Sequence, residues 1–223
     1  MGRLVSILIS ALAVIIGIVV HESAHALTAY LLGDSTARSR GRVSLNPLNH
    51  IDPFGTVILP LLMVLAGGPV FAYAKPVPVY LGNLKHPKRD EVLVALSGPV
   101  SNILIACLAA LVLSLSSPAL LSGSLSYRLS NLIASFLITC MSVNLSLAFF
   151  NLIPLPPLDG SSILVPFLHG DALRTYYQVQ RYAMPILIIV LYLLPSLTGI
   201  DIIGWYFDLT VYPILNALLS FAL

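Results

Sequence analysis

The chain has 223 residues, of which 58% are hydrophobic and only 9% are charged. This composition excludes a water-soluble globular protein, because a chain this apolar needs a lipid bilayer as its solvent. The net charge of +2 is too small to indicate nucleic-acid binding, and the Lys and Arg residues lie in short polar breaks between apolar runs, as membrane loops require.

The apolar runs predict an all-α fold, a polytopic bundle of transmembrane helices. The first run, residues 4–32, is long enough at 1.5 Å per residue to cross a hydrocarbon core of about 30 Å. The polar segment that follows, residues 33–52, alternates around Val43 and predicts a short strand or β-hairpin. Residues 53–74 are apolar but interrupted by Pro and Gly, which favours a re-entrant or broken segment as much as a straight span.

Four further spans are expected after this segment. They cover about residues 91–115, 129–153, 182–197 and 200–221, and the last could instead be an interfacial helix. We see no internal repeat, low-complexity tract or long linker. The sequence therefore predicts a single membrane-embedded domain over residues 1–223.

The first apolar run contains His21-Glu22-Ser23-Ala24-His25, a match to H-E-x-x-H. Residues four apart share one face of a helix, so the two imidazoles can bind one metal ion while Glu22 faces its water. Each ionisable residue deep in an apolar helix costs about 2.5–3.5 kcal/mol on insertion scales, and such residues persist mainly where function or pairing offsets that cost. The motif predicts a zinc hydrolase, and a cluster of satisfied polar residues near a helix end is the alternative.

A catalytic zinc site usually has three protein ligands and a water, so two histidines leave it one ligand short. The candidates for the third ligand are Asp159, Glu91, His50, His86 and His169. Asp159 stands out because it lies next to last in the Pro-rich break of residues 151–160, and irregular backbone at membrane depth usually lines a protein site. An ordinary Asp-Gly turn is the alternative there. Glu91 is second, although an acidic residue at a helix N-terminus is also explained by the helix dipole.

Two further motifs accompany His21–His25. They are Gly98-Pro99-Val100-Ser101-Asn102 and the Asn151–Gly160 run, which ends in Leu158-Asp159-Gly160. In this order, the three motifs resemble those of the site-2 protease family of intramembrane zinc metalloproteases. The Lys75-Pro76-Val77-Pro78 stretch resembles a compact form of the family, without PDZ or CBS domains.

The resemblance implies one zinc ion per chain, bound by His21, His25 and Asp159, with Glu22 as the catalytic base. It also implies that Asn102 bonds to the substrate backbone or the transition state, and helix packing is the alternative role for this residue. The substrate would be a transmembrane protein that unwinds for cleavage. A membrane transporter or metal-ion carrier could use the same side chains as a transport site. The sequence indicates no oligomeric state.

The positions of Lys and Arg predict the topology. For the histidine pair and Asp159 to share a metal, their helices must run in the same direction, which requires residues 53–74 to re-enter rather than to span. A re-entrant segment also leaves all Lys and Arg except Arg3 and Arg128 on one face. We therefore expect a multi-pass protein of a prokaryotic cell membrane, with its N-terminus outside and its active site towards the cytoplasm.

Overall fold

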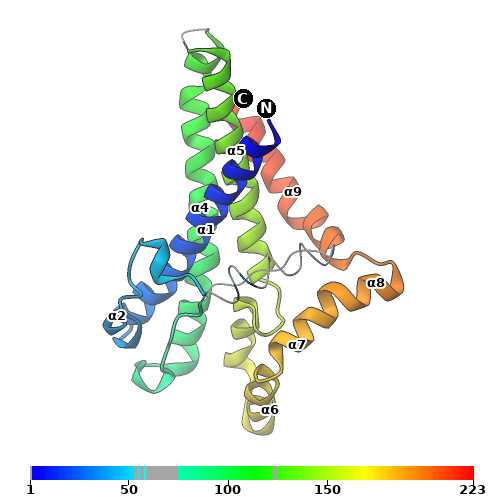
Figure 1. The fold of residues 1–223 in the computed structure, drawn as a ribbon. Helices are drawn as coiled ribbons and strands as arrows, with labels where there is room; N and C mark the ends of the chain where they lie inside the picture. The colour runs from blue at the N-terminus through cyan, green and yellow to red at the C-terminus, as the bar shows by residue number, and fades with distance from the viewer. Residues whose placement is uncertain (1, 53–54, 56–57, 59–74, 123–124) are drawn as a thin grey trace. The chain divides into compact units, whose positions relative to one another are not determined.

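The computed structural model describes residues 2–52, 55, 58, 75–122 and 125–223 (Figure 1). Over these residues the chain is helical and contains no β-strand. The elements are α1 (Arg3–Leu31), α2 (Thr36–Ser39), η1 (Pro47–Asn49), η3 (Leu81–Asn83), α4 (Pro87–Leu121), α5 (Tyr127–Asn151), η4 (Asp159–Phe167), α6 (Gly170–Gln180), α7 (Ala183–Ile188), η5 (Ile189–Leu193), α8 (Leu194–Thr198) and α9 (Ile202–Ala222). All η elements are 3-10 helices except η5, which is a π-helix.

Four helices are long and apolar enough to cross a membrane, namely α1, α4, α5 and α9. They correspond to four of the predicted spans. The fifth predicted span, 182–197, falls on Ala183–Thr198, which follows α6 at a bend of 74° and could complete a broken span with it. The chain is therefore a multi-pass membrane protein.

Helix α4 begins before the predicted span at residue 91. Its polar first turn is helical because Pro87 fits the first helical position and the Asp90 carboxylate accepts the backbone N–H of His86 at 2.8 Å. The predicted span did not include this turn, because the prediction followed the apolar residues and the turn is polar.

The predicted β-hairpin in residues 33–52 is wrong, because this segment forms α2, η1 and turns. Asp34 Oδ1 accepts the backbone N–H of Thr36 at 3.0 Å, and Asn46 Oδ1 accepts that of Leu48 at 3.1 Å. Both contacts start a helical turn locally, in competition with strand pairing. The predicted re-entrant or broken segment, 53–74, lies outside the described residues apart from residues 55 and 58.

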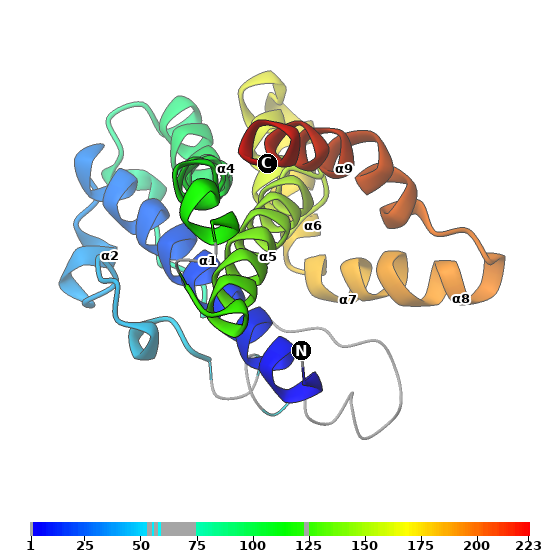
Figure 2. The same cartoon turned by 90° about the horizontal axis from the view of Figure 1, so that it is seen from above.

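The described chain divides into two compact units. We call residues 1–17, 99–152 and 201–223 the bundle unit, and residues 18–98 and 153–200 the site unit. In the bundle unit α9 packs against α5 (Figures 1 and 2), and Tyr206 Oη donates to Phe149 O at 3.1 Å. The core of this unit consists of Ala13, Ala106, Ala109, Ala110, Leu113, Leu137, Cys140, Met141, Leu145, Val211, Leu215 and Ala222. The alanines of α4 allow close helix contact in a bilayer.

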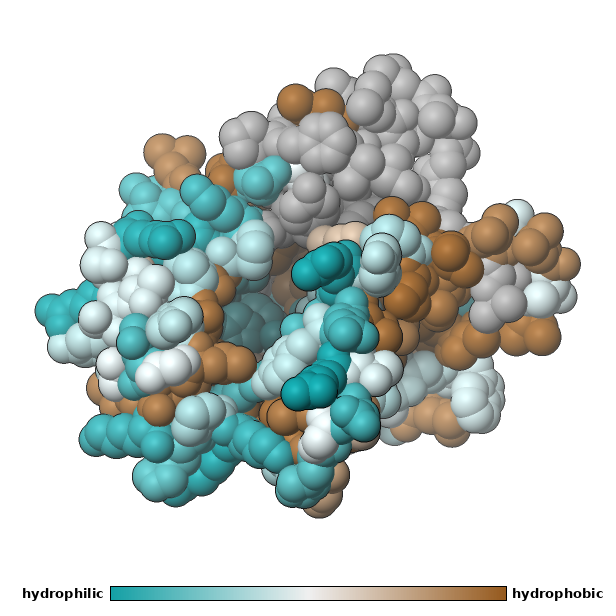
Figure 3. All heavy atoms as spheres, turned by 90° about the horizontal axis from the view of Figure 1, so that it is seen from below, coloured by the Kyte–Doolittle hydropathy of each residue, from teal (hydrophilic) through white to brown (hydrophobic). Residues whose placement is uncertain are grey.

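The site unit is held together by polar contacts between its loops. Asp34, which is fully buried, also accepts the backbone N–H of Tyr80 at 2.7 Å and the Asn83 side-chain amide at 2.8 Å. Burial alone would raise the pKa of Asp34, but these hydrogen bonds and those of Thr36 lower it to about 2. Figure 3 shows hydrophilic side chains gathered at the end of this unit where α2 and α6 lie. The expectation of a single membrane domain stays a prediction.

Candidate metal centre

The site unit brings together the two histidines of the H-E-x-x-H motif and Asp159. His21 Nε2 lies 3.1 Å from Asp159 Oδ2, and His25 Nε2 lies 3.4 Å from the same oxygen. One potential ligand atom from each residue lies within 4.8 Å of the others. Over the described residues, no other group of His, Cys, Asp or Glu converges in this way.

Local structure explains how these three side chains meet. His21 and His25 lie one turn apart on α1, with ring centroids 4.6 Å apart and ring planes at 86°. After α5 the proline-rich segment turns sharply, with the Leu158 amide donating to Leu155 O at 2.9 Å. Asp159 is then the first residue of η4. The cluster therefore joins an intact helix to a break in the helical chain.

Helix α4 shapes the histidine side of the cluster. Its Val94 carbonyl oxygen lies 2.7 Å from His25 Nδ1, so we assign the ring proton to Nδ1 and the free lone pair to Nε2, which faces Asp159. A Cβ atom at Gly98 would lie 2.5 Å from His25 Nε2 and 2.6 Å from His21 Nε2. Because Gly98 has no side chain, both imidazole rings fit against α4 at this position.

The donor set fits a zinc ion. Asp159 Oδ2 is buried and accepts no hydrogen bond from the described residues, although a buried carboxylate oxygen without a partner is costly. Two imidazole nitrogens and one carboxylate oxygen are the protein ligands of many catalytic zinc sites.

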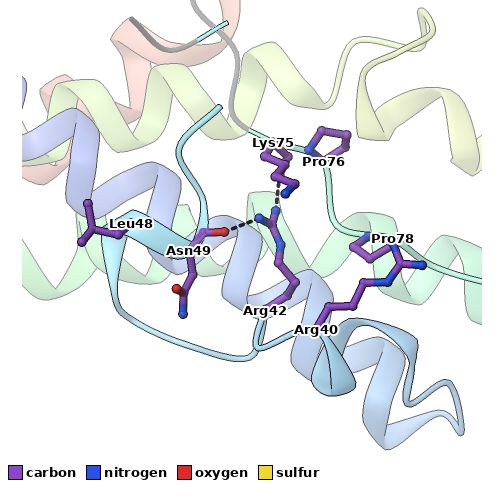
Figure 4. Close-up of a pocket in the computed structure, with 7 residues that line it drawn as sticks. All are labelled: Arg40, Arg42, Leu48, Asn49, Lys75, Pro76 and Pro78. Atoms are coloured by element: carbon purple, nitrogen blue, oxygen red, sulfur yellow. Dashed lines mark hydrogen bonds between the residues drawn. The ribbon is translucent and has the colours of Figure 1, made fainter. Parts of the chain in front are cut away.

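Glu22 lies on the same turn of α1 and is half-buried. Its charge acts on Arg42, a residue with only 3% of its surface exposed. Burial lowers the pKa of Arg42, and the charge of Glu22 opposes this effect. Arg42 donates to the carbonyl oxygens of Asn49 and Lys75 at one wall of a pocket of about 330 Å³ (Figure 4). The sequence did not predict that Arg42 lies near the H-E-x-x-H motif, because the two are separated by about 20 residues of sequence.

Comparison with known proteins identifies the family. The model of Peptidase family M50 matches residues 9–194. The chain belongs to peptidase family M50, the site-2 protease family.

Curated relatives of this M50 chain cover most of its length. It is 35% identical over 206 residues to "Putative zinc metalloprotease YwhC" of Bacillus subtilis, which covers 92% of this chain and 85% of that protein. It is 29% identical to "Putative zinc metalloprotease Rip2" of Mycolicibacterium smegmatis over 190 residues, 84% of this chain and 68% of that protein. "Putative zinc metalloprotease Rip2" of Mycobacterium tuberculosis H37Rv is also 29% identical over 198 residues, which cover 88% of this chain and 71% of that protein. No solved structure matches.

The other candidate ligands of this M50 chain make different contacts. His50 Nε2 lies 2.7 Å from Ser44 O, and the Glu91 carboxylate accepts the Tyr177 hydroxyl at 2.9 Å. His86 directly precedes α4, and His169 is exposed. Of the five candidates, only Asp159 lies with the histidine pair.

Asn102 is fully buried in the bundle unit. Its Nδ2 donates to Gly17 O at 3.1 Å and to Asn144 Oδ1 at 2.8 Å, which links α4 to α1 and α5. This is the arrangement expected of a polar side chain that joins membrane helices. Its role beside the substrate stays a prediction. The sequence analysis did not single out Asn144 as the partner of Asn102. A polar amide within an apolar run was the feature that could have indicated it.

Proposed function

We propose that this M50 chain is an intramembrane zinc metalloprotease that hydrolyses peptide bonds of transmembrane protein substrates. The observation that carries the proposal is the convergence of His21, His25 and Asp159 around a buried carboxylate oxygen without a hydrogen-bond partner among the described residues. Membership of a peptidase family and the zinc metalloprotease names of the relatives support both the reaction and the metal.

His21 and His25 would hold the zinc ion through Nε2, and Asp159 through a carboxylate oxygen. When bound, zinc polarises a scissile carbonyl and lowers the pKa of its water to about 7. The Val94 carbonyl keeps the proton of His25 on Nδ1, so that Nε2 remains a ligand. Gly98 leaves space for both rings at the position where any side chain would collide with them.

Glu22 is the general base of the proposed reaction. The H-E-x-x-H spacing places it beside the ligand pair, where it takes a proton from the attacking water and passes it to the leaving amine. A peptide bond within a helix resists attack because its carbonyl is internally hydrogen-bonded. Substrates should therefore contain helix-weakening Gly, Pro or Asn near the cleaved bond.

We further propose that the site faces the cytoplasm. The site unit contains every Lys and Arg assigned to that face, namely Arg38, Arg40, Arg42, Lys75, Lys85, Lys88, Arg89, Arg174 and Arg181. The two remaining basic residues, Arg3 and Arg128, are those that the positive-inside rule assigns to the opposite face. The backbone N–H of Lys75 also donates to His50 O at 3.0 Å. This hydrogen bond joins described residues on either side of the predicted re-entrant segment, and it supports the proposed topology.

The topology can be tested by cysteine accessibility. Leu45→Cys and Lys85→Cys, each in a background without Cys107 and Cys140, should react with an impermeant thiol reagent only from the cytoplasmic side. Labelling of the two positions from opposite sides would overturn the re-entrant topology.

The proposed activity is tested by zinc analysis of the purified protein together with cleavage of a model transmembrane substrate. Wild type should contain one zinc ion per chain and cleave. Glu22→Gln should keep the zinc and lose cleavage, whereas His21→Ala should lose both. Cleavage by Glu22→Gln at the wild-type rate would refute the role of Glu22, and equal zinc content in His21→Ala would refute the metal site.

A further inference from the structure

Glu91 is a carboxylate near the start of α4 that is not part of the metal-ligand cluster. Its Oε2 accepts a hydrogen bond from Tyr177 Oη at 2.9 Å, and its Oε1 accepts a longer one from Ser162 Oγ at 3.5 Å. A carboxylate in a helix that crosses the bilayer is unfavourable unless its partners offset the loss of water. The partners of Glu91 therefore indicate what it does.

Both partners belong to the part of the chain that follows Asp159. Ser162 lies three residues after Asp159 in η4, and Tyr177 lies in α6. A second contact joins the same two elements, because Ser161 Oγ lies 3.1 Å from Tyr176 Oη and both residues are buried. η4 and α6 are thus linked to each other, and Glu91 links both to α4.

Helix α4 contacts both sides of the cluster. Lys88, about one turn before Glu91, donates to Leu168 O, between η4 and α6, at 2.7 Å. Further along, Val94 O binds His25 and Gly98 makes room for the imidazoles. Residues 88–98 form about three turns of α4. Over these turns the helix contacts the segment that begins with Asp159 and also the two histidines of α1.

We propose that Glu91 is a positioning residue for Asp159. Through Tyr177 and Ser162 it fixes the start of η4, so that the Asp159 carboxylate reaches the two imidazole nitrogens. This inference rests on the proposed zinc site and adds to it a carboxylate that binds no metal itself. A general stabilising role would instead predict lower thermal stability with an unaltered metal site.

The test is the zinc affinity of the full chain in detergent, measured by competition with a chromophoric chelator. Tyr177→Phe removes only the hydroxyl that donates to Glu91, and it should weaken zinc binding about 10–100-fold, the usual effect of losing a group that orients a ligand. Glu91→Ala should have a similar effect. Glu91→Gln should have a smaller one, because its amide oxygen can still accept the hydroxyl. The matched control is Tyr182→Phe, whose ring is 62% exposed and whose affinity should equal that of wild type.

Two further measurements show whether the effect acts through Asp159. The visible spectrum of the cobalt-substituted protein, which reports ligand geometry, should change in Tyr177→Phe and not in Tyr182→Phe. In an Asp159→Ala background, Tyr177→Phe should cause no further loss of affinity. Wild-type affinity and spectrum in Tyr177→Phe, or an equal further loss without Asp159, would overturn the inference.

The outcomes also separate this inference from the proposed function. If wild type and His21→Ala bind zinc equally, the zinc site itself is wrong, and the role of Glu91 fails with it. If His21→Ala loses zinc and Tyr177→Phe does not, the zinc site stands and only the role of Glu91 fails.

Discussion

Replacing Gly98 with alanine should weaken the candidate metal site while leaving α4, the helix that carries Gly98, intact. The new Cβ would lie 2.5 Å from His25 Nε2 and 2.6 Å from His21 Nε2, whereas ordinary van der Waals contact begins at 3.4 Å. The imidazoles or α4 must therefore move apart by about 1 Å. A movement of α4 would also break the 2.7 Å contact between Val94 O and His25 Nδ1.

The expected magnitude follows from this displacement. A misplacement of about 1 Å at a reacting centre can lower the rate about 100-fold, and overpacking of a filled site costs about 1–3 kcal/mol. Alanine is a better helix former than glycine by about 1 kcal/mol. The substitution should therefore stabilise α4 itself, while the contact with the imidazoles destabilises the metal site. Loss of zinc from Gly98→Ala thus reports the contact with the imidazoles and not a weakened helix.

Zinc affinity and cleavage of a transmembrane substrate, measured for Gly98→Ala and for Gly2→Ala, would test this reasoning. Gly2 has no atom within 4 Å of its virtual Cβ, so its replacement should change neither quantity. Wild-type affinity and turnover in Gly98→Ala would show that the imidazoles do not occupy the positions described.

Two further predictions concern other buried polar groups. Because the pKa of Asp34 is about 2 when folded and 3.8 without its partners, its contribution to stability is complete above about pH 4 and is lost as the pH falls towards 2. Thermal unfolding in detergent should show wild type losing about 1–2 kcal/mol in this range and Asp34→Asn losing less. Asn102→Ala should lower the free energy of unfolding by about 1–3 kcal/mol, because it leaves Asn144 Oδ1 without its donor.

Each of these has a contradicting result. Equal acid sensitivity of wild type and Asp34→Asn would show that Asp34 is not the titrating group. For Asn102→Ala the control is Val100→Ala, a half-exposed position on the same helix. Equal stability of these two variants would contradict a packing role for Asn102. Reduced turnover of fully folded Asn102→Ala would support its predicted contact with the substrate.

The sequence predicted the helices, and it predicted the three side chains that converge in the candidate metal centre, because both depend on local patterns. A long apolar run identifies a membrane helix by length alone, and the four-residue spacing of His21 and His25 places both rings on one face. Asp159 could be selected because a proline-rich break at membrane depth is unusual. In each case the necessary information lies within one continuous stretch of the sequence.

The prediction of a hairpin was wrong because it rested on a short alternation of residues. It did not consider the side chains that start helical turns in the same segment. Alternation around Val43 is compatible with a strand, but Asp34 and Asn46 each bind a backbone N–H two residues ahead. Moreover, Arg42 is buried and bonded to the carbonyls of Asn49 and Lys75. The alternation gives no sign of this contact, because Lys75 lies 33 residues further along the chain.

The contribution of α4 to the metal centre was harder to predict, because it includes no metal-ligating side chain. Val94 contributes a backbone carbonyl, which any residue possesses, and Gly98 contributes the absence of a Cβ. Their spacing of four residues turns both towards the same side of α4 only while the helix between them is regular. Glu91 is the exception, because its side chain is visible in the sequence. There the helix dipole already offered a sufficient explanation for an acidic residue, and only its contacts with Tyr177 and Ser162 reveal a connection to Asp159.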